Sequence, residues 1–396
     1  MAIGILGRRG PLAQVSHIFS SQAKIAFLYW RQYQHTQDRG FLRDRAYPML
    51  KGVAEFYRNF PNLRKEANGK YHIHEVNNHE PVWGATDTQE EMSGMQGMLP
   101  AAIRASEILR IDADLRATLR EFLRDLAPLA TNASPNSPRP RKAGEPEVWI
   151  TGLPPVRHGN IAALGLVPAL EYDLCAVETA NETIRRIGSA TFDAAHPQIT
   201  AETPINVLNR EATAAANLGR AEAIRFMLPN QLRCLTPDHD FCDFKGGGPP
   251  AIQANRMTFR KGPGAIGVER IGRMAQALHA ALLQSAPPEP GGDPVLHVFP
   301  AWPKEWNAQY TLSGRGGYLV TSSIAGGKVG FVELCSHTDG ECRIRNPWGE
   351  AGVNVYRNGK GGETARGSLL RFAVKGGETV VLALAGVSLD SIKAAL

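Results

Sequence analysis

The feature that most constrains the fold is a change in hydrophobic period near residue 288. Before it, apolar residues recur at three- and four-residue spacing, which is typical of amphipathic helices. After the Pro-Pro-Glu-Pro-Gly-Gly run at residues 287–292 this period is lost, and short runs typical of β-strands follow. The chain of 396 residues also exceeds the roughly 250–300 residues at which single cores stop growing. We therefore predict a helical domain over residues 1–288 and a β-domain over residues 289–396.

The helical part consists of successive helix pairs joined by loops. We expect helices at residues 16–35, 41–60, 89–109, 112–126, 171–187, 204–217, 220–232 and 265–285. Pro100 is expected to kink or divide the third of them. An array of this kind favours α-hairpins arranged as a helical toroid, either closed or open.

The β part is expected to form a small antiparallel sandwich. Its expected strands include residues 295–299, 317–324, 328–335 and 378–384, with the glycine pairs 326–327 and 376–377 at tight hairpin turns. The five cysteines include no Cys-x-x-Cys pair, so a structural zinc site is not expected. Cys335 and Cys342 could face each other across a hairpin as a disulfide, or remain two free thiols.

Composition excludes several classes of function. The net charge of +6 is spread among acids, so nucleic acid is not expected as a partner. No run of roughly eighteen apolar residues predicts a membrane span, and the opening residues lack the long apolar core of a signal peptide. The three glycines at 246–248 are not followed by the Gly-Lys-Ser/Thr of a phosphate loop. No cofactor is expected.

The richest chemistry lies at residues 71–87, Tyr-His-Ile-His-Glu-Val-Asn-Asn-His-Glu-Pro-Val-Trp-Gly-Ala-Thr-Asp. These seventeen residues hold three histidines, two glutamates, two asparagines, a tryptophan and an aspartate. Connecting segments gain little stability from such side chains, whereas binding and catalysis use them. We interpret the segment as the active-site loop of a glycoside hydrolase, whose partner is a carbohydrate substrate.

Glycoside hydrolysis needs an acid that protonates the leaving oxygen and a carboxylate that attacks the sugar or activates water. Glu75 and Glu80 are the local candidates for the acid. We prefer Glu80, because Pro81 and Trp83 beside it would exclude water and raise the pKa of its carboxyl. The alternative is a glutamate that pairs with Arg or His to fix the loop.

Other side chains of the loop are candidates for substrate binding. Asn77 and Asn78 can donate to sugar hydroxyls, and Trp83 offers a flat apolar face to a pyranose. His72 and His74 would point the same way on an extended segment. Asp87 also belongs to this set, although an acid at the start of a helix is favoured by the macrodipole alone.

Two further interpretations of polar residues stay open, a metal site and a second catalytic loop. His72, His74 and His79 could together bind a metal, although their spacing matches no familiar metal motif; we therefore predict no metal. Acidic and imidazole groups also crowd residues 238–243, as a second catalytic loop or a solvated turn.

Three stretches resemble a known family. Residues 46–56, Ala-Tyr-Pro-Met-Leu-Lys-Gly-Val-Ala-Glu-Phe, are similar to a barrel-helix signature of the α-L-fucosidases of glycoside hydrolase family 95. Residues 86–89, Thr-Asp-Thr-Gln, resemble their Met-Asp-Met-Gln. Leu-Leu-Gln-Ser at 282–285, Phe-Pro-Ala-Trp-Pro at 299–303 and Arg-Gly-Gly-Tyr at 315–318 are similar to motifs near the end of their barrel.

The resemblance implies an (α/α)6 barrel, inverting chemistry and a C-terminal β-domain. The family's acid falls on or beside Glu80, and its second catalytic carboxylate lands on Glu269. The sequence around Glu269 does not reproduce the family's Asp-Gly-Asn-Phe-Gly, and the family's two water-positioning asparagines have no counterpart here. The hypothesis is an α-L-fucosidase-like inverting glycosidase, exported if the true N-terminus is missing; the alternative is a catalytically silent carbohydrate-binding or truncated relative.

Overall fold

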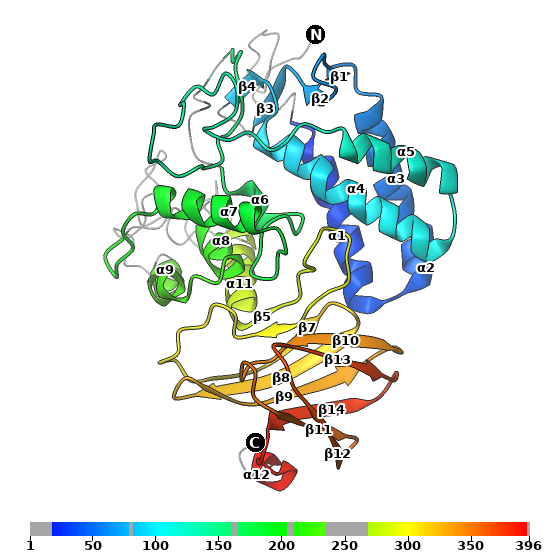
Figure 1. Cartoon of the computed structure of the whole chain (residues 1–396), viewed down its shortest axis with the longest axis vertical. Coiled ribbons are helices and arrows are strands. Elements are labelled where there is room, and N and C mark those ends of the chain that lie inside the picture. The colour runs from blue at the N-terminus through cyan, green and yellow to red at the C-terminus, as the bar shows by residue number, and fades with distance from the viewer. Residues whose placement is uncertain are drawn as a thin grey trace.

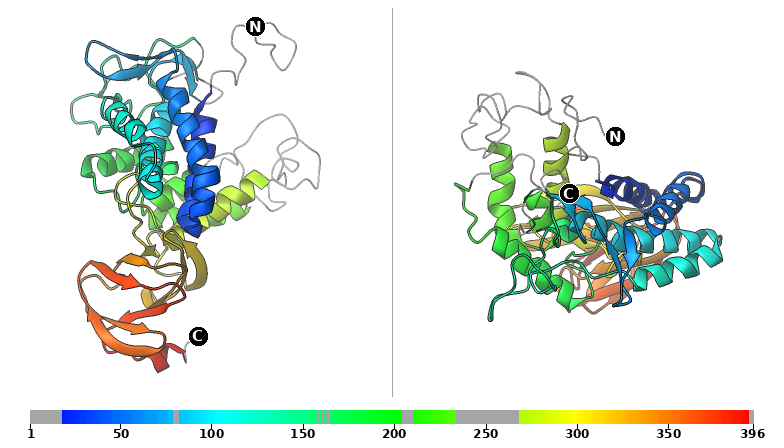
Figure 2. Two further views of the ribbon diagram at one scale, coloured as in Figure 1. Left: turned by 90° about the vertical axis from the view of Figure 1, so that its right-hand side faces the viewer. Right: turned by 90° about the horizontal axis from the view of Figure 1, so that it is seen from above.

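The computed structural model describes residues 18–78, 82–157, 159, 161, 165–203, 210–233 and 268–393. Among the described residues, nearly all helical residues precede residue 283 and most strand residues follow it. In Figure 1 the helices that precede residue 283 lie above the strands that follow it, and the same division is seen from the side in Figure 2. A mainly helical part followed by antiparallel β-structure is therefore what the chain forms.

The first helices pack against one another around α4. Their bounds are α1 Ser20–Thr36, α2 Arg39–Phe41, the π-helical turn η1 Leu42–Ala46, α3 Tyr47–Arg58, α4 Gln89–Leu109 and α5 Ala113–Arg124. Helix α1 ends where Gln37 adopts a left-handed conformation and its N–H bonds the carbonyl of Tyr33 at 2.7 Å. Asp38 then caps α2 by accepting from the N–H of Phe41. The two predicted helix pairs are confirmed, and Pro100 lies within α4 without dividing it.

The second group of helices is shorter. It comprises α6 Val167–Leu170, α7 Glu182–Ala195, α8 Glu211–Asn217, α9 Ala221–Arg233 and α11 Val268–Leu282. The prediction of a helix over residues 171–187 is wrong, because Tyr172 and Asp173 have positive φ angles of 63° and 57°. Helix α7 begins only after Asn181, whose side-chain oxygen accepts from the N–H of Ile184. The expected helix at 265–285 ends at Leu282, and residues 204–209 of the helix expected at 204–217 lie outside the described residues.

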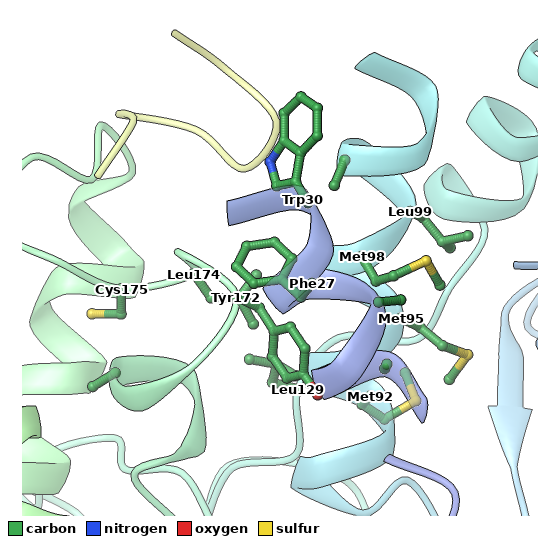
Figure 3. Close-up of a cluster of buried hydrophobic side chains, with 14 of the residues drawn as sticks. Phe27, Trp30, Met92, Met95, Met98, Leu99, Leu129, Tyr172, Leu174 and Cys175 are labelled. Carbon is green, nitrogen blue, oxygen red and sulfur yellow. The ribbon is translucent and has the colours of Figure 1, made fainter. Parts of the chain in front are cut away.

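The core of the helical part forms where α1 and α4 meet the segment that follows α6 (Figure 3). Phe27 of α1 and Tyr172 make an edge-to-face pair with ring centroids 5.3 Å apart. Methionines and leucines of α4 fill the opposite side, among them Met92, Met95, Met98 and Leu99, all fully buried. Each such side chain contributes roughly 1.5–3 kcal/mol by leaving water, so this cluster holds the helices in place.

Two small antiparallel pairs cover one end of the helical part. They are β1 Leu63–Lys65 with β2 Tyr71–Ile73, and β3 Val76–Asn78 with β4 Val82–Ala85. Another short pair, β5 Leu283–Gln284 with β6 His297–Val298, lies at the junction with the β part. The segment predicted to be the active-site loop thus contains three short strands.

The β part contains two antiparallel sheets. The larger has the order β12-β11-β14-β9-β8-β7 and the smaller pairs β10 with β13. The bounds are β7 Ala308–Gly314, β8 Tyr318–Ala325, β9 Lys328–Ser336, β10 Gly340–Arg345, β11 Val353–Arg357, β12 Lys360–Ala365, β13 Leu369–Val374 and β14 Thr379–Leu384, followed by helix α12 Leu389–Lys393. Side chains from both sheets share one hydrophobic core.

One expectation about turns is corrected, and of the two alternatives for the cysteines the structure has free thiols. The glycine pair 326–327 does join β8 to β9, but the pair at 376–377 connects strands of different sheets, so it forms no hairpin. Cys335 and Cys342 also do not face each other, because β9 pairs with β8 and β14 while β10 pairs with β13. Both are free thiols.

Within the described residues, no helix has the length and apolar character required to cross a bilayer. A closed (α/α)6 toroid, a sandwich class for the β part, and a domain boundary at residue 288 stay predictions. Ala301 belongs to the helical core although it follows that boundary, and Trp302 contacts both cores.

Candidate functional site

The predicted loop lies where β2, β3 and β4 meet the start of α4. Figure 1 shows these strands together beside the start of α4, at the end of the helical part farthest from the β part. Residues 79–81, which include Glu80, fall between β3 and β4 in the chain and lie outside the described residues. The structure describes the two strands on either side of this segment, β3 and β4.

Asn77 and Asn78 bind the β3–β4 pair to its neighbours. The side-chain oxygen of Asn77 accepts from the N–H of Gly84 at 3.1 Å, and that of Asn78 accepts from the N–H of Glu90 at 3.1 Å. Both side chains are buried. The amide nitrogen Nδ2 of Asn77 is buried and has no hydrogen-bond partner within the part of the chain that the structure describes. The first bond fixes β4 against β3, and the second fixes β3 against the first turn of α4.

Asp87 joins β2 to the start of α4. Its Oδ2 lies 2.6 Å from Nδ1 of His72, and its Oδ1 accepts from the N–H of Ile73 at 3.0 Å. Burial raises the pKa of Asp87, while the hydrogen bond from His72 opposes this increase. The N-cap of α4 is Thr88, so the Asp87 carboxylate supports the strand and does not cap the helix.

His74 and Trp83 are more open than the buried residues of β3 and β4. Nε2 of His74 lies 3.0 Å from Oε1 of Glu66, and its Nδ1 lies 3.3 Å from the hydroxyl of Thr86. Both His74 and Trp83 are half-buried. The structure therefore leaves part of each ring accessible to a ligand.

The segment from Leu153 to Arg157 lies alongside β4 and is hydrogen-bonded to it. The N–H of Arg157 bonds the carbonyl of Trp83 at 2.8 Å, and its guanidinium pairs with Glu75 at 2.8 Å. Gly84 has a φ of +67°, and a Cβ there would lie 2.9 Å from Cγ of Arg157. Glycine is required at this position because the backbone bends into the left-handed region directly under an arginine side chain.

Sequence reasoning did not find the acidic pair Glu90 and Glu91 at the start of α4. The carboxylate of Glu91 accepts from the hydroxyl of Tyr57 at 2.6 Å and from the N–H groups of Phe19 and Ser20 at 2.7 and 2.8 Å. Burial raises the pKa of Glu91 to about 7, against these hydrogen bonds.

Glu90 has its own partners. Its Oε1 lies 3.0 Å from the ammonium of Lys24, and its Oε2 accepts from the hydroxyl of Ser20 at 3.1 Å. Acidic residues are common in the first turn of a helix because the macrodipole stabilises negative charge there. The sequence therefore gives no sign that both carboxylates are buried. Together they join the start of α1 to the start of α4, directly beneath the predicted loop.

The second predicted carboxylate lies elsewhere in the fold. Glu269 belongs to the first turn of α11, as its expected position within a helix implies, and its side chain lies outside the described residues. The polar segment at 238–243 and His79 also lie outside them. Among the residues that the structure describes, no three His, Cys, Asp or Glu side chains group together as metal ligands.

The sequence model of the glycosyl hydrolase family 95 catalytic domain matches residues 9–136. This match confirms the resemblance to family 95 over a segment that includes α1 to α5 and the whole of the predicted active-site loop. A search of curated protein sequences found no significant match.

The solved structures to which this chain is similar include three carbohydrate-active proteins. A putative kojibiose phosphorylase from the human microbiome has 10% identity and a TM-score of 0.44, covering 89% of this chain and 49% of its own. An α-L-rhamnosidase from Streptomyces avermitilis has 11% identity and a TM-score of 0.45, covering 92% and 32%. A GH127 β-L-arabinofuranosidase from Geobacillus stearothermophilus T6 has 12% identity and a TM-score of 0.23, covering 95% and 55%.

This chain therefore spans about half, about a third and slightly more than half of the lengths of those three proteins. Their TM-scores lie below 0.5, so these similarities carry no argument about the fold or the chemistry of this chain. The family match over residues 9–136 is the comparison that bears on the site.

Proposed function

We propose that this chain is a glycoside hydrolase of the α-L-fucosidase-like type, which inverts the anomeric configuration of its substrate. The observation that carries the proposal is the family 95 match, because the matched residues 9–136 include the loop at residues 71–87. The chemistry of this loop supports the same function independently, since it contains acids, amides and an aromatic ring of the kinds that sugar cleavage uses.

In the proposed reaction, Glu80 is the general acid. It donates its proton to the glycosidic oxygen as the bond to the anomeric carbon breaks, and a second carboxylate, Glu269, removes a proton from the attacking water. Water attacks the face opposite the leaving group, so the product has inverted configuration. An inverting pair requires roughly 6.5–9.5 Å between the two carboxyl groups to leave room for the water.

The loop residues divide into two groups in this proposal. Trp83, His72 and His74 are half-buried, and we assign them to contact with the sugar. Asn77, Asn78 and Asp87 are buried and hydrogen bonded to the strands and to α4. We assign these three to holding the backbone on both sides of Glu80. Nδ2 of Asn77, which has no partner among the described residues, is assigned to donate to a substrate hydroxyl.

The test compares Glu80→Gln with Glu75→Gln, which removes the other candidate acid of the loop. Glu80→Gln should lower kcat on alkyl α-L-fucosides by about 10²–10⁴, the usual contribution of a general acid. On aryl fucosides with good leaving groups the loss should be much smaller, because those oxygens leave without a proton.

Glu75→Gln should retain most of the activity, and unfolding curves of both variants should match the wild type. Equal losses on both kinds of substrate would contradict the role of Glu80. The same would follow if only Glu75→Gln showed the dependence on leaving group.

A further inference from the structure

A polar cavity lies at the other end of the helical part, where the helices meet the β part. It has a volume of about 150 Å³ and is lined by α1, α11, the segment after α6 and the turn between β7 and β8. A water molecule needs about 10–15 Å³ of such space, so the cavity has room for several waters or one small polar molecule. Arg31 lies eleven residues beyond Ser20 along α1, roughly 17 Å at the helical rise, so this site is separate from the loop at residues 71–87.

Two of the arginines in this region are matched by carboxylates. Arg315 makes a two-pronged pair with Asp173, with N–O distances of 2.5 and 2.8 Å, and both groups are buried. Arg210 pairs with Glu171 through Nη1 and donates to Oε1 of Gln276 at 3.1 Å through Nη2. These two ion pairs are close to neutral as units.

Arg31 is the third arginine and carries the surplus charge. Its Nη2 lies 3.5 Å from Oδ1 of Asp173, an oxygen that already accepts from Arg315. Its Nε is buried and has no hydrogen-bond partner among the described residues. The guanidinium lies over the ring of Phe27, 5.0 Å from the centroid. The Arg31 side chain is 22% exposed, and an unused buried donor on a largely buried cation is costly unless an anion or water compensates it.

Gln284 contributes the opposite kind of unused group. Its Nε2 donates to the carbonyls of Ala216 and Ala280 at 2.6 and 3.1 Å, which fixes the orientation of the amide. Its Oε1 is buried and finds no hydrogen-bond donor among the residues described, and the residue lines the same cavity. The cavity therefore offers one surplus cation with a free donor and one free acceptor.

We propose that this cavity binds a small oxyanion that also carries a hydroxyl group, of which hydrogen phosphate is the simplest. The anionic oxygens would accept from Arg31, and the P–O–H would donate to Oε1 of Gln284. A chloride ion lacks the donor, and a neutral sugar leaves the charge of Arg31 uncompensated. The inference does not depend on the proposed glycosidase activity.

Two histidines at this site provide a reporter for the anion. Nδ1 of His35 lies 3.0 Å from the hydroxyl of Ser313. Burial lowers the pKa of His35 to about 4, with further lowering by Arg315, His279 and Arg31, and Asp173 acting in the opposite direction. Burial and Arg315 also lower the pKa of His279. An anion among these cations should raise the pKa of both rings.

The experiment titrates the full chain with inorganic phosphate at constant ionic strength, maintained with sodium chloride. Calorimetry gives the affinity, and proton NMR of the imidazole C–H resonances gives the pKa of His35 with and without phosphate. We expect saturable binding, a raised pKa for His35, and weaker binding of sulfate, which has no hydroxyl near neutral pH.

Arg31→Met keeps an apolar stem over Phe27 and should weaken phosphate binding by about tenfold or more, as expected for loss of a charged hydrogen bond. Arg45→Met, an exposed arginine outside the cavity, is the matched control and should bind as the wild type does. The wild-type titration alone remains decisive if Arg31→Met does not fold. No saturable binding, or an unchanged pKa for His35 at saturation, would overturn the proposal and leave water as the occupant; equal weakening in both variants would mean that the anion binds to the surface only.

Discussion

Glu91 illustrates how one side chain can serve two helices. It belongs to the first turn of α4, yet it accepts from the N–H groups of Phe19 and Ser20, where α1 begins. Those N–H groups have no partner within their own helix, so a carboxylate from α4 satisfies them. The sequence shows Glu91 only as an acid near a helix start, because the burial that changes its chemistry comes from segments far away in the chain.

The burial of Glu91 predicts a specific dependence of stability on pH. Its pKa is raised from an ordinary 4.5 to about 7, so the folded chain holds this proton more strongly than the unfolded chain. The protonated Glu91 carboxyl therefore stabilises the folded chain by roughly 3 kcal/mol below pH 4.5, and this stabilisation is lost as the pH rises to about 7. Glu91→Gln removes this titration and keeps an oxygen for Phe19 and Ser20.

Urea unfolding of the wild type and Glu91→Gln at several pH values between 4.5 and 7.5 checks this. The free energy of unfolding of the variant, relative to the wild type, should increase with pH across that window. Glu121→Gln, at an exposed position of α5, should show no such trend. A constant difference between Glu91→Gln and the wild type would contradict the account.

At the scale of elements, sequence predicts those helices whose boundaries are set locally. The bounds predicted for α4, residues 89–109, are those that the structure shows, because its apolar period is long and its ends carry ordinary signals. The helix predicted at 171–187 fails for a non-local reason. Asp173 pairs with Arg315 from the β part, and the ring of Tyr172 packs against Phe27; neither partner is near in sequence.

The candidate site divides in the same way. The sequence predicts that His72 and Asp87 belong to the same loop, and the structure places their side chains in direct contact. It could not show that Asn78 holds the first turn of α4 through Glu90, since that bond requires the fold of both elements. Substrate contact by these residues stays a prediction.

Replacement by alanine should have opposite effects on stability at two helical glycines, Gly97 of α4 and Gly52 of α3. A Cβ at Gly97 would lie 2.1 Å from Cβ of Tyr172, a position fixed by the backbone. Gly97→Ala should therefore destabilise the chain by roughly 1–3 kcal/mol, although alanine favours helices. Gly52→Ala on α3 meets nothing within 4 Å and should stabilise by roughly 0.5–1 kcal/mol. Denaturant midpoints decide this, and a gain in both variants would disprove the close contact.

At the scale of the whole molecule, buried ion pairs join the helical and β parts. Asp173 binds Arg315, and Glu178 binds both His297 at 2.8 Å and Arg345 at 2.5 Å. Glu178 is 3% exposed in its side chain. Burial alone would raise the pKa of Glu178, but the hydrogen bonds from His297 and Arg345 have the larger combined effect and lower the pKa to about 2. The junction thus depends on charge as well as on apolar contact.

This junction predicts a loss of stability in acid. Because the pKa of Glu178 is lowered from 4.5 to about 2, its contribution is present above pH 4.5 and is lost as the pH falls toward 2. Glu178→Gln should lower the free energy of unfolding at pH 7 by roughly 3 kcal/mol. The difference from the wild type should shrink at pH 3. Chemical unfolding at the two pH values measures this, and a difference of equal size at both would show that the charge of Glu178 is not what stabilises the junction.

We propose Glu80 as the acid of an inverting glycosidase, and the configuration of the first product is the measurement that decides this. Proton NMR should follow wild type and Glu80→Gln on a panel of alkyl and aryl α-L-fucosides, α-L-galactosides and β-L-arabinosides. We predict that the wild type releases sugar of inverted configuration from at least one of them, and that the variant fails on its alkyl glycoside. Retained configuration, or no release from any substrate by folded wild-type protein, would contradict the account.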